Sequence, residues 1–264
     1  MTRPKAIIVT GAAGGIGTAL LDLLLQMPDF SRYYIIASDT PDNLDQDQSP
    51  AKNWPSRVIP APLNLTDYEA LKTFVASVTQ DYDITGLAHL AGLLAHGPVI
   101  DLDLQEFDSL LAVNVTATVH LYQAVAQAMV AQAQGPEQVD RAIVTVASNA
   151  ANGPRAHMAA YGASKAFASH FTRSLGLELA PWRIRTNVVN PGTTLTPMVH
   201  AMWGGEDQRA ESIAGDPKLY RAGIPLGRVA EPADIAHPVA FLLSPAARHI
   251  NLAELTVDGG ATQR

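Results

Sequence analysis

Three side chains in the stretch 148–165 could act together on one proton. Tyr161 and Lys165 are four residues apart in an alanine-rich segment, and on a helix that spacing places both side chains on one face. A phenol in water titrates near pH ~10, and an ammonium group close by stabilises the phenolate. We therefore expect Lys165 to lower the pKa of Tyr161 and make it a general base, with the hydroxyl of Ser148 at the end of the preceding strand.

The composition argues against several other classes of protein. The chain has 264 residues, no cysteine and a formal net charge of −7, which removes thiol catalysis and fits a cytoplasmic protein. No Lys or Arg run could follow a phosphate backbone, so we expect no nucleic-acid partner. The eight histidines lack metal-ligand spacing, so we expect no metal. No stretch approaches the roughly 20 apolar residues of a membrane span, so we expect no membrane partner.

Strands and helices alternate along the whole chain. β-Branched runs predict seven strands, at 5–10, 33–38, 57–61, 84–90, 141–147, 184–189 and 254–257. The connection 41–56 is polar and contains several prolines, which predicts a loop. Alternation of this kind predicts one parallel sheet covered on both faces. We expect a single α/β domain over 1–264, with a doubly wound, seven-stranded, Rossmann-like parallel sheet and helices on both faces.

The first predicted strand is followed by a glycine loop that suits a dinucleotide. Gly11, Gly15 and Gly17 permit a tight turn and let backbone N–H groups approach a pyrophosphate at the start of the next helix. Asp39 ends the second strand, where a carboxylate can accept from ribose hydroxyls and would repel a 2′-phosphate. No arginine follows it directly. These features favour NAD, although glycine turns are common and Asp39 could be a turn residue.

Further candidate contacts of a cofactor lie where later strands end. Asn64, after the third strand, could receive an adenine amino group or serve only as a turn residue. Ala91 and Gly92 leave room for a ligand at the end of the fourth strand. The loop 191–196 follows the sixth strand and carries three threonine hydroxyls that could face a carboxamide.

Asn114 lies in an otherwise apolar stretch that predicts one long helix over 106–134. A buried amide must find hydrogen-bond partners. Two interpretations are equally open: Asn114 bonds to the helix backbone, or it holds a water or kinks the helix near Lys165.

Substrate recognition is expected in two segments. The segment 197–223 combines adaptable apolar side chains, among them Met202 and Trp203, with glycines that could act as hinges, which favours a substrate lid over a disordered connector. Arg155 is the best placed cation for a carboxylate-bearing substrate, because it lies between the candidate serine and tyrosine. His157 is the second candidate, and a solvated loop arginine is the alternative interpretation of Arg155.

Together these motifs resemble the short-chain dehydrogenase/reductase family. The strings TGAAGGIG, YGASK and NPG occur in the family's order over the whole chain, with Asn114 and Ser148 between them. The resemblance implies that Ser148, Tyr161 and Lys165 form a catalytic triad, and that Asn114 positions a proton-relay water beside Lys165. With the residues above, it implies that NAD is bound by Gly11, Gly15, Ile16, Gly17, Asp39, Asn64, Leu65, Ala91, Gly92, Tyr161, Lys165, Pro191, Gly192, Thr194 and Thr196.

Shorter strings resemble one branch of that family. AIVTVAS, GLELA, PGTTLTPM and GIPLGRVAEPADIA are similar to the branch that oxidises 2,3-dihydro-2,3-dihydroxybenzoate in catecholate siderophore biosynthesis. The resemblance implies NAD-dependent oxidation of one ring alcohol, and a homotetramer. Three alternatives stay open: a related cyclohexadiene carboxylate, a 3-oxoacyl-type carbonyl, and a nucleotide sensor without catalysis.

The chain departs from the family pattern at two positions. His89 stands where the family usually has asparagine, which puts an interaction that stabilises the sheet in question. Asn64 stands where the family often has aspartate, which affects only the contact to adenine.

Overall fold

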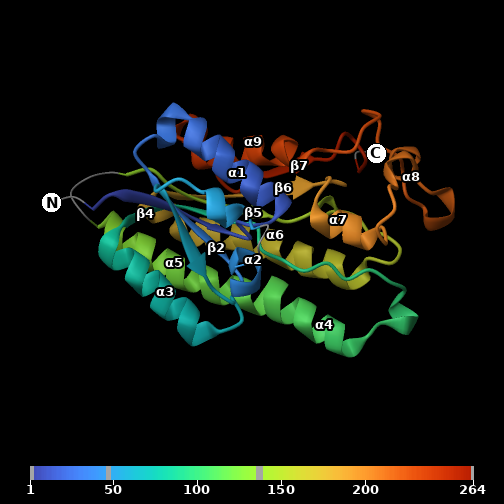
Figure 1. Cartoon of the computed structure of the whole chain (residues 1–264), viewed down its shortest axis with the longest axis horizontal. Coiled ribbons are helices and arrows are strands. Elements are labelled where there is room, and N and C mark those ends of the chain that lie inside the picture. The colour runs from blue at the N-terminus through green and yellow to red at the C-terminus, as the bar shows by residue number, and fades with distance from the viewer. Residues whose placement is uncertain (1–2, 46–48, 135–138, 263–264) are drawn as a thin grey trace.

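Seven parallel strands form one sheet, as expected, and their order is β3-β2-β1-β4-β5-β6-β7 (Figure 1). The strands are β1 (Lys5–Thr10), β2 (Tyr34–Asp39), β3 (Val58–Pro62), β4 (Asp83–His89), β5 (Arg141–Val146), β6 (Ile184–Pro191) and β7 (Glu254–Val257). This computed structural model describes residues 3–45, 49–134 and 139–262. The ends of the expected 1–264 domain and the middle of the 41–56 connection lie outside those residues. The strand order reverses between β1 and β4, and in parallel sheets ligands bind at that switch point, beyond the carboxyl ends of the strands.

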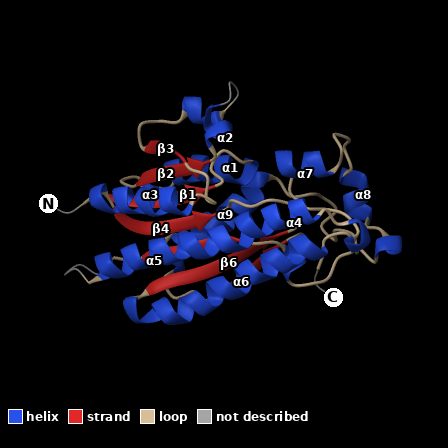
Figure 2. Cartoon of the chain, turned by 90° about the horizontal axis from the view of Figure 1, so that it is seen from below, coloured by secondary structure: helices blue, strands red, loops and turns tan. Residues whose placement is uncertain are grey.

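The two faces of the sheet bury alternate side chains of each strand. The covering helices are α1 (Gly15–Gln26), α3 (Tyr68–Asp81), α5 (Thr118–Ala133), α6 (Ala159–Leu179) and α9 (Pro232–Leu243). Ile7 and Val9 of β1 lie in a core with α1 and α9, whereas Ala6 and Ile8 lie in a second core with α3 and α5. Figure 2 shows α3, α5 and α6 side by side across the second face. The period of two along a strand thus produces the two-sided sandwich.

The polar connection 41–56 is not a loop throughout. It contains a short helix, α2 (Pro41–Asp45), and a 3₁₀ turn, Pro50–Asn53. Both begin with proline, whose fixed φ suits the first position of a helix and which lacks the N–H that would go unpaired there. The prediction of a loop was wrong for these residues because proline was interpreted only as a helix breaker.

The helix predicted over 106–134 is interrupted. It consists of α4 (Leu104–Leu111), a π-helical turn (Ala112–Ala117) and α5. By length and composition alone this run could cross a bilayer, so the expectation that no stretch approaches a span was wrong on that point. Leu121, Val125 and Met129 are fully buried in the core on the α3 face. Core packing therefore accounts for the apolar composition of α5.

Two short helices lie beyond the carboxyl ends of the strands. α7 (Pro197–Met202) and α8 (Arg209–Ala214) follow β6 and stand at the end of the molecule away from its N-terminus (Figure 1). The segment that was expected to be a lid is therefore folded, and it lies at the end of the sheet where parallel α/β folds bind their ligands.

Candidate active site

The loops after β1, β4 and β6 meet at the carboxyl edge of the sheet. A Cβ on Gly11, which has φ +69°, would lie 2.8 Å from the backbone N of Ala91. A Cβ on Gly15 would lie 3.1 Å from Cγ2 of Thr196, and one on Gly17 would lie 2.2 Å from the carbonyl oxygen of Gly11. Real Cβ atoms do not approach backbone so closely, so glycine is required at positions 11 and 17. The glycines predicted from the sequence bring three loops together.

Asp39 fastens the glycine loop to the end of β2. Its Oδ2 accepts from the backbone N of Ala13 at 2.9 Å. Its Oδ1 accepts from the backbone N of Thr40 at 2.8 Å and from Nδ2 of Asn43 at 2.7 Å. A carboxylate has about four lone-pair sites, so one on Oδ2 is left for a ribose hydroxyl. The N-cap of α1 is Gly14, which has no side chain to accept a hydrogen bond from the first turn. The N–H groups of that turn are therefore available to a phosphate. These residues fit a dinucleotide.

The residues expected after β6 hold their own loop together. The Thr194 hydroxyl donates to the carbonyl oxygen of Gly192 at 3.0 Å. The Thr196 hydroxyl accepts from the backbone N of Val199 at 3.4 Å and caps α7. Pro191 is the last residue of β6. These hydroxyls shape the 191–196 loop beside the glycine loop, and they leave lone pairs on both residues and the O–H of Thr196 available to a ligand.

Three other residues expected at the cofactor also have structural contacts. The side-chain oxygen of Asn64 accepts from the backbone N and the hydroxyl of Thr66, at 3.1 and 2.9 Å, which is the turn role that the sequence left open. Leu65 is buried in the core on the α3 face, and Ile16 packs against the core on the α1 face.

The structure brings Ser148 and Tyr161 together at the end of β5 and the start of α6. Tyr161 is half-buried, and its phenol is hydrogen-bonded to the side chain of Ser148. Burial raises the pKa of Tyr161, and the Ser148 bond and the charge of Arg155 only partly offset that rise. The expected net lowering of this pKa by Lys165 is therefore wrong, because the cost of burying a phenolate exceeds the favourable contacts.

Lys165 lies one turn along α6 from Tyr161, on the same face as predicted. Its Nζ donates to the carbonyl oxygen of Val146 at 3.2 Å and lies 5.9 Å from the centre of the Tyr161 ring. Burial lowers the pKa of Lys165 to about 8. A Cβ on Gly92 would lie 3.0 Å from this Nζ, so the β4 loop closes over the lysine.

Asn114 links the β4 loop to α6 from within the π-helical turn. Its Oδ1 accepts from the backbone N of Leu93 at 2.8 Å, and its Nδ2 donates to the carbonyl oxygen of Leu93 at 2.9 Å and to Oγ of Ser164 at 3.0 Å. None of these bonds goes to its own helix backbone. Of the two open interpretations, bonding of the side chain to the helix backbone is therefore wrong, and the helix contains a π-helical turn at Asn114, a feature that is frequent at functional sites.

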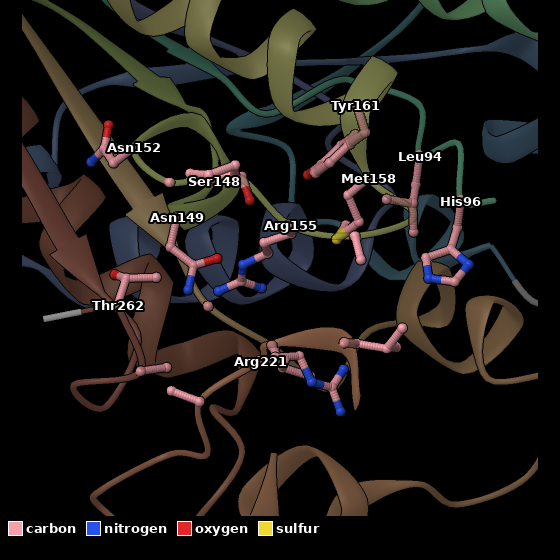
Figure 3. A pocket seen from close by; sticks show the side chains of 18 of the residues that line it. Leu94, His96, Ser148, Asn149, Asn152, Arg155, Met158, Tyr161, Arg221 and Thr262 are labelled. Atoms are coloured by element: carbon pink, nitrogen blue, oxygen red, sulfur yellow. The ribbon is translucent and has the colours of Figure 1, made fainter. Parts of the chain in front are cut away.

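A cavity of about 630 Å³ opens beside the triad (Figure 3). Its lining includes Ser148, Tyr161, Arg155 and Met202. His157 and Trp203, which were expected to contact the substrate, do not line it: Trp203 is 4% exposed, and the ring of His157 stands edge-on to that of His96. The size suits a small organic ligand.

Comparison with known proteins identifies the family. A family model described as short chain dehydrogenase matches residues 5–207. The chain belongs to the short-chain dehydrogenase family. It is 38% identical over 261 residues to the vibriobactin-specific 2,3-dihydro-2,3-dihydroxybenzoate dehydrogenase of Vibrio cholerae serotype O1, covering 97% of this chain and 95% of that protein. It is 37% identical over 260 residues to the 2,3-dihydro-2,3-dihydroxybenzoate dehydrogenase of Bacillus subtilis, covering 98% and 96%.

A solved structure agrees with this assignment. A short chain dehydrogenase/reductase family protein superposes with a TM-score of 0.80 at 27% sequence identity, over 98% of this chain and 97% of that one. The seven-stranded parallel sheet with two helical layers is therefore the fold of this short-chain dehydrogenase, and the chain is an oxidoreductase.

His89, which stands where the family usually has asparagine, connects two hydroxyl groups through its two ring nitrogens. Its Nδ1 lies 2.8 Å from the hydroxyl of Thr10, and its Nε2 lies 3.0 Å from the hydroxyl of Thr118. The Thr118 hydroxyl donates in turn to the carbonyl oxygen of Asn114 at 2.9 Å. Burial, reinforced by the charge of Lys165, lowers the pKa of His89 to about 3. A neutral imidazole thus connects the end of β1 to the π-helical turn.

Sequence reasoning missed several cavity residues of the dehydrogenase, among them His96 and Arg221. Arg221 stands inside the 197–223 segment that was expected to contact the substrate. The segment also carries Arg209, Lys218 and four acidic residues, so its sequence alone gave no signal that singled out Arg221. Its significance depends on a second arginine far away in the sequence, Arg155, which lines the same cavity.

Proposed function

We propose that this short-chain dehydrogenase oxidises 2,3-dihydro-2,3-dihydroxybenzoate to 2,3-dihydroxybenzoate with NAD, as a step of catecholate siderophore biosynthesis. Two relatives with that activity in their names align over nearly the whole chain. The observation that carries the proposal is that one cavity holds Ser148, Tyr161 and Arg155. An acid–base pair and a guanidinium group in one cavity suit a ring that carries both a hydroxyl and a carboxylate.

The residues that would hold NAD are the glycine loop, Asp39 and the β4 and β6 loops. When bound, NAD supplies the nicotinamide that accepts a hydride from the carbinol carbon. The carboxylate of Asp39 favours a ribose with a free 2′-hydroxyl, because a 2′-phosphate would place two like charges together. NAD, not NADP, is therefore the expected cofactor.

The chain's own groups move the proton. The phenolate oxygen of Tyr161 accepts the proton of the substrate hydroxyl, and the hydroxyl of Ser148 hydrogen-bonds the same substrate oxygen. Because burial raises the pKa of Tyr161, the phenolate needs cations near it. Arg155 lowers that pKa, and Lys165, with a pKa of about 8, is mostly charged at pH 7.

The product explains the direction of the reaction. Removal of two hydrogens from the cyclohexadiene diol gives a dienone, and its tautomer is the aromatic catechol ring. Aromatic stabilisation makes the oxidation strongly favourable. The site therefore has to promote deprotonation of the alcohol, but it does not have to shift the equilibrium of the reaction towards the product.

The remaining expectations belong to the same proposal. The 197–223 segment is a lid over the cavity, which Met198, Val199 and Met202 help to line. The protein is a cytoplasmic homotetramer, acts on a small carboxylate, and has no nucleic-acid or membrane partner. The proposed reaction needs no metal, and among the described residues no group of three or more His, Asp or Glu side chains could hold one.

The direct test supplies purified protein with NAD and the dihydrodiol and follows the absorbance of NADH. Tyr161→Phe should remove nearly all turnover while NAD binding is kept, because the ring stays and only the proton acceptor is lost. Tyr82→Phe is the matched control, since Tyr82 lies at the amino end of β4, away from the site. Turnover by Tyr161→Phe refutes the assignment of the general base. If the protein forms no NADH from the dihydrodiol, the assignment of the substrate is refuted.

A further inference from the structure

Two arginines line the cavity without an acidic partner. Arg155 lies in the loop between β5 and α6, and Arg221 follows the 3₁₀ turn Pro217–Leu219 (Figure 3). Within residues 3–45, 49–134 and 139–262, neither guanidinium forms an ion pair with Asp or Glu. By contrast, Arg141, Arg173, Arg185, Arg209 and Arg228 each form an ion pair. Two partly buried cations without counter-charges are costly unless an anion joins them.

Arg221 is held in place by its backbone. Arg221 and Asp216 exchange two backbone hydrogen bonds of 2.9 Å, and Nη2 of Arg221 donates to the carbonyl oxygen of Glu211 at 3.3 Å. Its Nε is buried and has no hydrogen-bond partner among the described residues. A buried donor without a partner is costly, so this group is preorganised for an acceptor that the protein does not supply.

The two arginines are close enough to affect each other. Burial, and after it the charge of Arg221, lowers the pKa of Arg155. Asp258 is the carboxylate that acts on Arg155 in the opposite sense, but its oxygens already accept from Asn149, Gly260 and Thr262. A chain with a net charge of −7 thus gathers cations at one cavity, and mutual repulsion between them would be relieved by a bound anion.

We propose that Arg221 and Arg155 together bind the carboxylate of the substrate, with Arg221 as a specificity residue contributed by the 197–223 segment. This inference rests on the proposed function and names the recognition element within that site. A guanidinium offers a planar fork of donors that matches a carboxylate. Ser148 and Tyr161 lie in the same cavity, so a ring whose carboxylate is held by the two arginines presents its hydroxyls to the proton acceptor. Neutral cyclohexadiene diols would lose this contact.

Two stable probes isolate the carboxylate. 2,3-Dihydroxybenzoate and catechol differ by that one group, and calorimetry measures their binding to the enzyme without turnover. We expect the wild type to prefer 2,3-dihydroxybenzoate about a hundredfold, with about tenfold from each arginine. Arg221→Gln should lose about tenfold in affinity for 2,3-dihydroxybenzoate, because it loses a charged hydrogen bond, and should bind catechol as before. Arg155→Gln, in a different loop, should behave alike, and the double variant should bind both probes about equally.

Arg209→Ala is the matched control, because Arg209 belongs to the same segment, is exposed and pairs with Asp207. The proposal is overturned if Arg221→Gln keeps the wild-type ratio of the affinities for 2,3-dihydroxybenzoate and catechol. It is also overturned if Arg209→Ala lowers that ratio as much as Arg221→Gln does. A loss in Arg155→Gln alone also overturns it, because one arginine then suffices. If the enzyme does not oxidise the dihydrodiol but the ratio still depends on both arginines, the carboxylate site stands and only the proposed substrate fails.

Discussion

His89 should make the stability of this dehydrogenase depend on pH. Its pKa is lowered to about 3 by burial and by the charge of Lys165, whereas an unfolded histidine titrates near ~6.5. Below pH ~6.5 the unfolded chain therefore binds a proton that the folded protein rejects. The stabilising contribution of the neutral ring is present above pH ~6.5 and is lost as the pH falls towards 3.

The size of the effect follows from the two pKa values. Each pH unit in this window costs ~1.4 kcal/mol, so His89 should lower the free energy of unfolding by about 2 to 3 kcal/mol between pH 7 and pH 4.5. His89→Asn removes this dependence but leaves the hydroxyl of Thr10 or Thr118 without its partner, which costs ~1–3 kcal/mol at pH 7. The variant should be the less stable protein at pH 7 and should equal or exceed the wild type near pH 4.5.

Urea denaturation followed by tryptophan fluorescence at both pH values, at one protein concentration, measures this difference. Acidic groups common to both proteins cancel in the comparison. His249→Asn, at an exposed position, is the control and should keep the wild-type dependence. Parallel loss of stability in the wild type and His89→Asn would show that His89 is protonated in the fold, and would refute the reasoning.

Three other predictions concern the cofactor and the catalytic lysine. Asp39→Ala should weaken NAD by about tenfold, through the loss of a charged hydrogen bond, and improve NADP relative to NAD, which KM values for both cofactors measure; an unchanged preference contradicts the role of Asp39. Gly92→Ala should reduce kcat about tenfold in steady-state assays, because the added Cβ would lie 3.0 Å from Nζ of Lys165 and 3.1 Å from Oδ1 of Asn114 and must displace one of them; wild-type kcat would show that neither position matters. Lys165→Met should abolish turnover yet raise the free energy of unfolding at pH 7 by up to ~3 kcal/mol, because the buried amine, with a pKa of about 8, is charged there at a cost. That gain should shrink between pH 8 and pH 10, where the folded lysine becomes neutral before the unfolded one, and a less stable variant in urea denaturation at pH 7 contradicts it.

The sequence alone was sufficient for the fold and for the place of the site. Alternating β-branched runs and helices imply a covered parallel sheet, whatever the details of packing. Gly11, Gly17 and Asp39 could be assigned because a tight turn and a strand end are local features. Tyr161 and Lys165 could be paired because a helix fixes the geometry of residues four apart.

Only the tertiary structure decided what surrounds those groups. The pKa of Tyr161 rises because burial dominates, and burial depends on packing between elements that are distant in the chain. His89 is neutral because packing between distant elements buries it and places it near the charge of Lys165. Arg155 and Arg221 line one cavity because the loop after β5 and the segment after β6 fold over the same end of the sheet. Local sequence determines which groups can do the chemistry. The electrostatic environment of those groups and the recognition of the substrate depend on long-range contacts, which the spacing of residues along the chain does not reveal.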